Sequence, residues 1–596
     1  MARNSTNQDE KLEFHSRRYI LKKLASYLKP FKGKVAIVIL LMIFVTACGL
    51  INPYLLKMAL DDFVPNSNIG GLVIIALGLM VVNLISLFAA RIRIIMMSQV
   101  TNSILITIRH DLYSHIQKLS FSFFDNRPVG KVLARVMGDV NALKSLFATS
   151  ITSFIPQLLS LVFVTIIMFS LNFNLAVAAM IILPVLGLGL FSIEAKSRSR
   201  WLSYRQKRSN VNAYTHEDFS GIKVVQGFAE EKKSESRFHN MVSEMMDSFN
   251  SAVKLNDLFW PLVELSWGFG TILVYWLGAK LIVSSDISIG TLVAFSMYIT
   301  MFWRPIMNIS DFYNTLITNF AAAERIFEIM SVEPDIVSSD GASEMPKIKG
   351  TVEFKEVSFA YDDDDVTVLK NVSFKVNPGD SIALVGATGA GKTTIINLLS
   401  RFYDVTDGSV LIDGIDVRSV TLESLRGQMG IMLQDTFLFS DTIKENIRYG
   451  RLDATDDEVI AAAKAVNAHD FIMKLEDGYE TEVNERGSRL SVGQRQLISF
   501  ARALLANPRI LILDEATSNI DTYTEMLVQN GINKLLKGRT SFVIAHRLST
   551  IRDCDKIMVI DDGRIVEAGT HDELLKLKGY YYNLYMAQYR FLKEGA

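Results

Sequence analysis

The sequence predicts two domains in series: an α-helical membrane domain with six spans, followed by an α/β domain of the P-loop type. Three observations predict this fold class. Apolar residues are concentrated before about residue 320, in stretches long enough to cross a bilayer. From about residue 348, short β-branched runs alternate with helical ones, which is typical of an α/β domain with a largely parallel core sheet. The segment GATGAGKTT, Gly386–Thr394, lies between such a strand and a helix.

The six predicted spans have the length of about 20 residues that a bilayer requires. They lie near residues 35–59, 70–97, 147–171, 175–193, 258–283 and 289–309. The whole chain is 49% hydrophobic and 21% charged, with a mean hydropathy of +0.24, which is apolar for a soluble protein. Its net charge of −1 argues against a nucleic-acid partner.

The placement of lysine and arginine orients the spans. The segment before the first span is basic, and so are the long connections at residues 98–146 and 194–257. The other connections are short and lack lysine and arginine, so the positive-inside rule puts both chain ends and the α/β domain in the cytoplasm. Residues 1–33 are predicted to be a cytoplasmic amphipathic segment lying along the inner surface of the plasma membrane.

The membrane domain is predicted over residues 34–325, a linker over 326–347, and the nucleotide-binding domain over 348–596. The two long cytoplasmic connections show helical periodicity and contain little Gly or Pro. We therefore expect the membrane helices to extend into the cytoplasm and reverse there. The expected reversals, at residues 122–130 and 217–228, are placed to touch a cytoplasmic domain.

The segment GATGAGKTT matches the pattern G-x-x-x-x-G-K-[ST] in the strand–loop–helix context that the motif requires. Its glycines allow backbone N–H groups to surround phosphates, and the following helix adds its positive end. Lys392 is predicted to reach the β- and γ-phosphates, and Thr393 to ligate Mg²⁺. The predicted ATP-binding residues here are Gly386, Thr388, Gly389, Ala390, Gly391, Lys392, Thr393 and Thr394.

An acidic pair follows the apolar run ILIL in the segment RILILDEATS. A buried strand that ends in Asp514 is suited to holding Mg²⁺, directly or through water. Glu515 then lies where a general base polarises the attacking water. Such a pair is often only a solvated strand end, but a P-loop in the same domain favours the catalytic interpretation.

The motifs, taken in order, resemble those of one family. A P-loop, LSVGQ, LILDEATS and AHR resemble the nucleotide-binding domain of ABC transporters. Six spans before one such domain resemble an ABC exporter half-transporter with the type IV exporter fold, and the resemblance covers residues 17–590. It implies ATP-driven export coupled to ATP hydrolysis. It also implies that two half-transporters pair, with each ATP between the P-loop of one chain and the signature segment of the other.

Further roles follow from the resemblance, at matching positions only. Tyr361 in VSFAY matches the aromatic residue that stacks on adenine. Gln434 in IMLQD matches the residue that contacts Mg²⁺ and the attacking water, and His546 in IAHR matches the histidine that contacts the γ-phosphate. The implied catalytic residues are Glu515, His546 and Gln434, and the implied Mg²⁺ ligands are Thr393, Gln434 and Asp514.

The signature segment LSVGQ departs from the family pattern LSGGQ at Val492. Ser491, Gly493 and Gln494 match the residues that bind the partner's ATP. A β-branched residue disfavours positive φ and adds bulk near a phosphate, so an altered contact is expected. The combination of a variant signature with an intact P-loop, Asp514 and Glu515 resembles one subunit of a heterodimeric exporter. The alternative is a homodimer that tolerates valine at this position.

The cargo predicted from the family is a small hydrophobic or amphipathic compound, a drug or a lipid. Glu264, Arg304 and Asp311 are polar groups in or near the spans, where such groups are costly unless they have a role. A Glu264–Arg304 pair is expected either to join helices or to contact substrate. Asp61 and Asp62 are expected to help gate the outer exit. Candidate cavity residues are Trp260, Trp267, Phe269, Trp276, Phe295, Met297, Met301 and Phe302.

Other functions stay open beside heterodimeric multidrug export. A homodimeric exporter of the lipid-flippase type, an ATP-gated channel or regulatory membrane protein, and an importer with an exporter-like fold have the same motifs. A soluble ABC-type ATPase of DNA repair is excluded, because such a protein has no membrane spans.

Overall fold

The computed structural model describes residues 16–125, 127–339, 341–361, 366–432, 436–484, 487–514, 522–544 and 551–594. These residues form two units. The membrane unit contains the described residues up to Gln117 together with Val129–Val332. The nucleotide unit contains Lys118–Pro128 and the described residues from Glu333 onward. The short segment Lys118–Pro128 therefore belongs to the nucleotide unit, although membrane helices flank it in the sequence.

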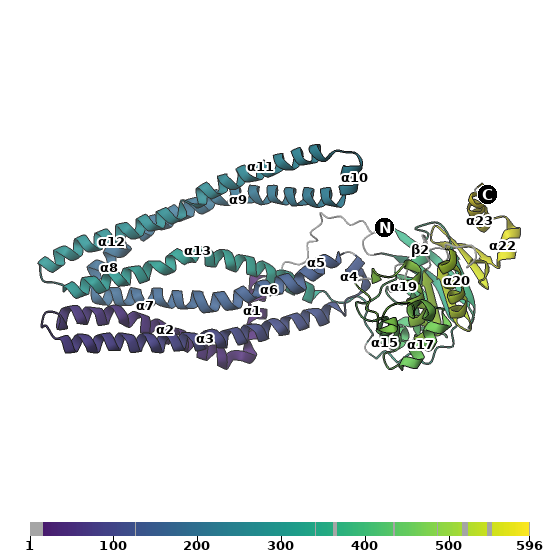
Figure 1. The fold of residues 1–596 in the computed structure, drawn as a ribbon, viewed down its shortest axis with the longest axis horizontal. Helices are drawn as coiled ribbons and strands as arrows, with labels where there is room; N and C mark the ends of the chain where they lie inside the picture. Colours follow the sequence, from purple (N-terminus) through teal and green to yellow (C-terminus); the bar gives the residue numbers. More distant parts are fainter. Residues whose placement is uncertain are drawn as a thin grey trace. The chain divides into compact units, whose positions relative to one another are not determined.

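Within the described residues, six helical stretches of the membrane unit are long and apolar enough to cross a membrane (Figure 1). They are Arg18–Phe63, Ile69–Ile116, Val129–Leu171, Phe173–Ser220, Glu231–Val283 and Ile289–Asn308. Each overlaps one stretch predicted from the sequence, so the six-span fold class is confirmed. Several extend well beyond the roughly 30 Å of hydrocarbon that about 20 residues span, as the helical periodicity of the long connections predicts.

The helices of the membrane unit pack in pairs. Helix α2 lies against α3, α9 lies along α11, and α13 lies against α7 and α2 (Figure 1). Asn68 and Ser288 accept backbone N–H bonds at the starts of α3 and α13, which fixes where these helices begin. The bounds are α1 Arg17–Leu28, α2 Lys32–Met58, α3 Ile69–Ile116, α5 Val129–Leu133, α6 Val140–Ser145, α7 Ile155–Leu171, α8 Phe173–Met180, α9 Leu183–Ser220, α10 Ile222–Gly227, α11 Glu231–Asn256, α12 Phe259–Val283 and α13 Ile289–Ser331.

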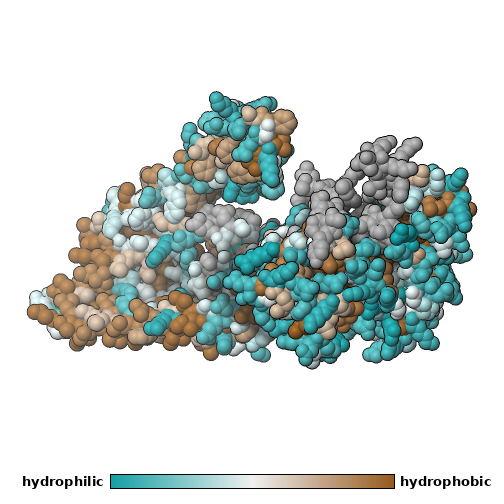
Figure 2. Space-filling view, turned by 45° about the vertical axis from the view of Figure 1, so that its right-hand side comes forward, coloured by the Kyte–Doolittle hydropathy of each residue, from teal (hydrophilic) through white to brown (hydrophobic). Residues whose placement is uncertain are grey.

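The core of the membrane unit lies where α7, α8, α12 and α13 meet. Val164, Met168, Tyr298 and Trp303 are among its buried residues. The Tyr298 hydroxyl donates to the carbonyl oxygen of Leu50 at 2.8 Å, which satisfies its one polar atom. Many other large apolar side chains of these helices are exposed and form hydrophobic surface, whereas the nucleotide unit is mostly hydrophilic outside (Figure 2). Exposed apolar surface of this extent is expected where lipid is the solvent.

Two predictions about the spans are wrong. Phe295 and Phe302 are buried in the core just described, so they fill helix contacts and do not line a cavity. The Glu264–Arg304 pair is absent among the described side chains, where both residues are exposed. The side chain of Asp311 lies outside the described side chains. The spacing of residues along a helix predicted which ones share a face, but not which neighbouring helix covers that face.

The end of the first span and the start of the sixth span are joined through Asp61. Its carboxylate accepts the Ser288 hydroxyl at 2.5 Å and the backbone N–H of Gly290 at 2.8 Å. A Cβ on Gly290 would lie 2.6 Å from Asp61 Oδ1, so glycine permits this close approach. Asp62 makes no such contact among the described side chains. Of the two predicted gate residues, Asp61 makes the inter-helix contact.

Within the predicted N-terminal segment, helix α1 packs one side against other helices of the membrane unit. Ile20 and Leu24 on its apolar face are buried, and its Tyr27 hydroxyl donates to Asp111 of α3 at 3.1 Å. The Tyr27 ring also stacks on Phe327 of α13. Part of the apolar face is thus covered by other helices of the membrane unit.

The nucleotide unit contains a six-stranded sheet of order β10-β9-β3-β8-β7-β6. Strands β9, β3, β8, β7 and β6 are parallel, and β10 pairs with β9 in the antiparallel sense, so the predicted largely parallel core sheet is confirmed. A separate antiparallel sheet has the order β2-β1-β4-β5. The bounds are β1 Val352–Ala360, β2 Thr367–Val376, β3 Ser381–Val385, β4 Asp407–Ile412, β5 Ile415–Asp416, β6 Met429–Met432, β7 Ile510–Asp514, β8 Thr540–Ile544, β9 Lys556–Asp561 and β10 Arg564–Gly569.

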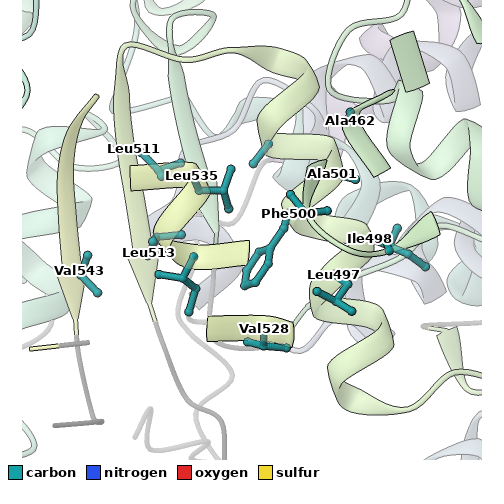
Figure 3. Close-up of a cluster of buried hydrophobic side chains, with 14 of the residues drawn as sticks. Ala462, Leu497, Ile498, Phe500, Ala501, Leu511, Leu513, Val528, Leu535 and Val543 are labelled. Atoms are coloured by element: carbon teal, nitrogen blue, oxygen red, sulfur yellow. The ribbon is translucent and has the colours of Figure 1, made fainter. Parts of the chain in front are cut away.

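Both faces of the central strands β9, β3, β8 and β7 are buried. Along β7, Leu511 and Leu513 belong to one core cluster, while Ile510 and Ile512 belong to the other. Figure 3 shows the first cluster, in which Phe500 of α19 lies near Leu513 and Val528 of α20. Burial on both faces explains why these strands read as continuous apolar runs. The main helices are α14 Lys392–Leu399, α15 Leu422–Arg426, α16 Ile443–Arg448, α17 Asp456–Ala465, α18 His469–Ile472, α19 Val492–Ala506, α20 Thr522–Leu536, α22 His571–Leu577 and α23 Tyr580–Glu594.

Candidate ATP site

The P-loop joins the end of β3 to the start of α14. Gly386 has φ 157°, and a Cβ there would lie 2.2 Å from the carbonyl oxygen of Ile560. Gly391 has φ 107°, and its Cβ would lie 2.7 Å from Leu369 Cδ2. Both positions require glycine, because an L side chain would be strained and would clash. Thr388 and Gly389 between them are exposed, which leaves this turn open to a ligand.

Lys392 folds back over the P-loop. Its Nζ donates to the carbonyl oxygens of Gly386 and Ala387, both at 2.8 Å. Burial lowers the pKa of the Lys392 ammonium, and the charge of Asp514 opposes that shift. Lys392 is a buried cation whose acceptors are neutral carbonyl oxygens, so a nearby anion would stabilise its charge. The residues present therefore fit the phosphates of ATP.

Asp514 lies on the same edge of the sheet as the P-loop. It ends β7 and is opposite Ile544 of β8, which in turn is opposite Leu384 of β3. The carboxyl ends of these parallel strands therefore meet where the P-loop begins. Thr393, exposed at the start of α14, offers a hydroxyl oxygen there. A carboxylate and a hydroxyl near phosphates are ligands of the type that Mg²⁺ accepts.

Tyr361 follows β1 and reaches the P-loop helix. Its hydroxyl lies 3.2 Å from Thr394 Oγ1, and Ala390 and Thr394 are both buried beside the loop. Its ring is held edge-on by Phe359 and by Tyr403, with centroid distances of 4.8 Å and 5.1 Å. An aromatic ring fixed next to a phosphate-binding turn is suited to stacking on a nucleotide base.

The signature segment forms the start of α19. Ser491 Oγ accepts the backbone N–H of Gln494, and Gln494 Oε1 accepts that of Ser491, so the two side chains form a capping box. Gly493 is buried in the first turn. Arg495 braces the preceding turn by donating to the carbonyl oxygen of Leu490 at 2.8 Å.

The expected backbone conflict at Val492 does not arise. Val492 is the first residue of α19 and has helical dihedrals, and no residue from 491 to 494 has positive φ. The prediction failed because a glycine in the family pattern was taken to mean positive φ, whereas this position only starts a helix. The Val492 side chain is 38% exposed, so what valine adds is bulk on the helix terminus.

Only some of the predicted ATP-site residues lie together in the structure. It brings together the P-loop, Asp514 and Tyr361. Within the described ranges, no hydrogen bond links Ser491, Gly493 or Gln494 to those residues. The predicted catalytic residues Glu515, His546 and Gln434 lie outside the described residues.

Sequence reasoning missed Tyr403 and the loop residue Asp125 that contacts it. Tyr403 packs on Tyr361, and its hydroxyl donates to Asp125 Oδ2 at 2.5 Å. The signal available was an aromatic pair, Phe402–Tyr403, directly after the P-loop helix, together with the aromatic tip SFFD at residues 122–125. The sequence predicted that the reversal at residues 122–130 touches a cytoplasmic domain, but not which residues of that domain it meets.

Comparison with known proteins agrees with this geometry. Residues 35–306 match the model of the ABC transporter transmembrane region, and residues 369–518 match that of the ABC transporter domain. An uncharacterized ABC transporter ATP-binding protein of Bacillus subtilis, YknV, is 44% identical over 95% of this chain and 94% of its own length. The chain belongs to the ABC transporter family.

Two further relatives define the type of ABC transporter. An ATP-dependent lipid A-core flippase of Syntrophus aciditrophicus is 38% identical over 100% of this chain and 99% of its own. A bacterial Atm1-family ABC exporter solved with ATP bound has a TM-score of 0.77 and 30% identity, covering 94% of this chain and 98% of that one. The predicted exporter fold is confirmed. This ABC exporter is a multi-pass membrane protein that binds ATP and couples its hydrolysis to transport.

Proposed function

We propose that this ABC exporter moves hydrophobic or amphipathic compounds, drugs or lipids, across the plasma membrane by alternating access. The observation that carries the proposal is the P-loop site on the same chain as six spans. There, Lys392 is a buried cation whose hydrogen-bond partners among the described residues are carbonyl oxygens. Closure of two such sites around ATP is the energy source for opening the membrane helices outward.

The P-loop backbone from Gly386 to Gly391, with Lys392, Thr393 and Thr394, holds the triphosphate, and Tyr361 stacks on the adenine. Thr393, Asp514 and Gln434 hold Mg²⁺, which neutralises charge on the phosphates when it is bound. The support is the shared sheet edge of Asp514 and the P-loop, and the contact between Tyr361 and Thr394.

Glu515 is the proposed general base, assisted by His546 and Gln434. Its support is its place directly after Asp514, at the end of the buried strand β7. We expect Glu515→Gln to keep ATP binding and to lower hydrolysis by about 100-fold or more, since general-base catalysis contributes on the order of 10²–10⁴. Steady-state phosphate release and ATP binding on the same sample measure both. Near-normal turnover would contradict the assignment.

ABC exporters work as dimers, and the surface of the second loop tip supports this for the present chain. Phe219, Val224 and Phe228, on and around α10, are exposed at 69%, 62% and 78%. Apolar side chains at a loop tip outside the spans are costly in water. A second half-transporter that covers them removes that cost.

We propose that the partner is a different half-transporter. The support is Val492, whose branched side chain is exposed on the helix terminus that bears Ser491, Gly493 and Gln494. Its bulk narrows the approach of a phosphate to the backbone N–H groups of that turn. A partner with glycine at this position supplies the unhindered signature segment for the P-loop of this chain.

The test is steady-state ATP hydrolysis by this chain alone in lipid nanodiscs, with Glu515→Gln as the control. A folded chain that binds ATP and does not hydrolyse it is the result expected for half of a heterodimer. Robust hydrolysis that disappears in Glu515→Gln would overturn the heterodimer and indicate a homodimer that tolerates Val492.

The cargo proposal draws on the similarity to a lipid flippase over nearly the whole chain. Trp260, Phe269 and Trp276 of α12 are exposed aromatic side chains that suit amphipathic ligands. The measurement is ATP-dependent, directional movement of a labelled lipid and a labelled cationic dye in sealed proteoliposomes. Ion conductance without ATP-dependent accumulation would favour the channel alternative.

We also propose that both chain ends and the nucleotide unit lie in the cytoplasm, as the positions of lysine and arginine predict. The only two cysteines of the chain, Cys48 and Cys554, are buried, so an introduced cysteine is the reactive one. Asn66→Cys, in the short first connection, is expected to react with an impermeant maleimide added outside whole cells. Ser236→Cys, at an exposed position of the long basic connection, is expected to react only after permeabilisation. The opposite labelling pattern would overturn the orientation.

A further inference from the structure

The segment Lys118–Pro128 is fastened to the nucleotide unit at three points. The hydroxyls of Ser120 and Ser122 donate to Asp335 Oδ2 at 2.9 Å and 2.7 Å. The ring of Phe121 packs on Phe402 with a centroid distance of 5.0 Å. At the end of helix α4 (Phe121–Asp125), the Asp125 carboxylate accepts the Tyr403 hydroxyl at 2.5 Å. The third contact links the segment to the aromatic residues beside the P-loop.

The Tyr403 ring then contacts the predicted base-stacking residue. Its edge-on geometry with Tyr361 has a centroid distance of 5.1 Å and an interplanar angle of 88°. The far end of Tyr361 is held by its hydroxyl, 3.2 Å from Thr394 Oγ1 on the P-loop helix. The orientation of the Tyr361 ring is thus set by Thr394 at the hydroxyl and by Phe359 and Tyr403 at the ring.

The backbone around Tyr403 is held on both sides. Arg401 is buried, donating to Asp404 Oδ1 at 3.1 Å and to the carbonyl oxygen of Val420 at 3.2 Å. The guanidinium of Arg426 lies 5.0 Å over the Phe402 ring. With its neighbours held in this way, the remaining motion is rotation of the Tyr403 side chain, which its ring contacts with Phe359 and Tyr361 already limit. The bond to Asp125 restricts that rotation.

We infer that Tyr403 is a positioning residue for the nucleotide base, with its ring set by Asp125 of the segment Lys118–Pro128. Tyr403 acts through its support of the ring of Tyr361, on which the base stacks, and not through the phosphates. Affinity for the base therefore depends on whether this segment is seated, while affinity for the phosphates does not. The inference rests on the proposed role of Tyr361 as the stacking residue.

The test compares two ligands, ATP and inorganic tripolyphosphate, which has the phosphates but no base. Equilibrium binding is measured on the full chain in nanodiscs in the Glu515→Gln background, so that ATP is not consumed. An edge-to-face aromatic pair is worth about 0.5–1.5 kcal/mol, so Tyr403→Ala is expected to raise the Kd for ATP about 2- to 12-fold. The Kd for tripolyphosphate is expected to stay unchanged. A structural defect would weaken both ligands.

A double-mutant cycle isolates the hydroxyl–carboxylate contact. Tyr403→Phe and Asp125→Ala each remove it and keep the aromatic packing, so each is expected to raise the Kd for ATP about twofold. The double variant is expected to be no weaker than either single variant, because both changes remove the same bond. Ser122→Ala is the matched control: it removes a hydroxyl–carboxylate bond of the same segment, to Asp335, and is expected to leave the Kd for ATP unchanged.

Tyr361→Ala separates this inference from the proposed base site. If Tyr361→Ala leaves ATP binding unchanged, the base site itself is wrong. If Tyr361→Ala weakens ATP but Tyr403→Ala does not, the positioning role is overturned. Equal weakening of ATP and tripolyphosphate by Tyr403→Ala overturns it as well, and additive effects of Tyr403→Phe and Asp125→Ala overturn the role of Asp125.

Discussion

The P-loop and the signature segment both end at a helix N-terminus, but they are built in opposite ways. Before α14, the P-loop has glycines at positive φ and no side-chain cap, so no capping side chain occupies its backbone donors. Before α19, Ser491 and Gln494 close a capping box, and residues 491–494 have no positive φ. The P-loop therefore requires glycine at fixed positions and leaves room for a ligand. The signature segment caps its own helix and tolerates the side chain of Val492.

The largest effect is expected from Gly386→Ala, which places a Cβ 2.2 Å from the carbonyl oxygen of Ile560 at φ 157°. Backbone strain alone costs about 1–3 kcal/mol, and the clash adds to it. We expect loss of measurable ATP binding and a lower unfolding temperature of the full chain in detergent. Gly389→Ala is the control, since its Cβ would have nothing within 4 Å and only φ 86° opposes it. Equal effects of Gly386→Ala and Gly389→Ala would contradict the conclusion that the P-loop requires glycine at position 386.

A smaller effect is expected from Ser491→Ala, which removes the cap of α19. Losing such a cap costs about 1 kcal/mol, because the N–H of Gln494 loses its acceptor. We expect a modest fall in the unfolding temperature and, with a competent partner chain, a several-fold fall in hydrolysis. Ser491→Thr keeps the hydroxyl and is expected to retain most of both. If Ser491→Ala were as damaging as Gly386→Ala, the signature segment would not be self-supporting.

Val492→Gly sharpens the comparison further. Glycine costs about 1 kcal/mol in a helix interior and less at a first position, so stability should change little. The opened terminus is expected to give the chain alone measurable ATP hydrolysis in nanodiscs, where the unchanged chain has none. Val492→Ala, which removes the branch and retains helix propensity, should give the same direction. Unchanged hydrolysis in both variants would show that the bulk of Val492 does not limit activity.

The smallest effect concerns the pH dependence of ATP binding. Burial holds the pKa of Lys392 below its usual range, so the ligand-free site loses this proton at a lower pH than an ordinary lysine does. The Kd for ATP should therefore rise on going from neutral pH toward pH of about 10. Without ligand the sign reverses: the unfolded chain keeps the proton longer, so stability rises through the same range. Lys392→Arg, which does not titrate there, should have a flat Kd profile.

Local pattern predicted much of this molecule. The continuous apolar run of β3 and the motif after it specify the P-loop without reference to tertiary contacts, because strand, turn and helix signals are all within residues 381–399. The six spans could likewise be predicted from local stretches of sequence. The antiparallel sheet was not distinguished from the core sheet, since a strand such as β2 shows alternation whichever partner it has.

Contacts between distant segments could not be predicted. Phe295 and Phe302 are aromatic residues within a span, so they were predicted to line a cavity. Only the packing of α13 against its neighbours shows that they belong to the core. The bond between Asp125 and Tyr403 spans 278 positions in the sequence, and each residue alone resembles an ordinary surface polar group. The backbone dihedrals at Val492 were mispredicted. A glycine in a family pattern does not show whether it is needed to allow positive φ or to leave room for a neighbouring group.

The membership of Lys118–Pro128 in the nucleotide unit makes this transporter less modular than its order of domains implies. Besides the step at Val332–Glu333, the chain passes between the units at Gln117–Lys118 and again at Pro128–Val129. A fragment that began at residue 333 would lack the segment that covers part of its surface. Phe402 would lose its ring contact with Phe121, and Tyr403 would lose its hydrogen bond to Asp125. Gene fusions that exchange nucleotide-binding domains between exporters would have to exchange this short insert as well, or redesign the aromatic surface it covers.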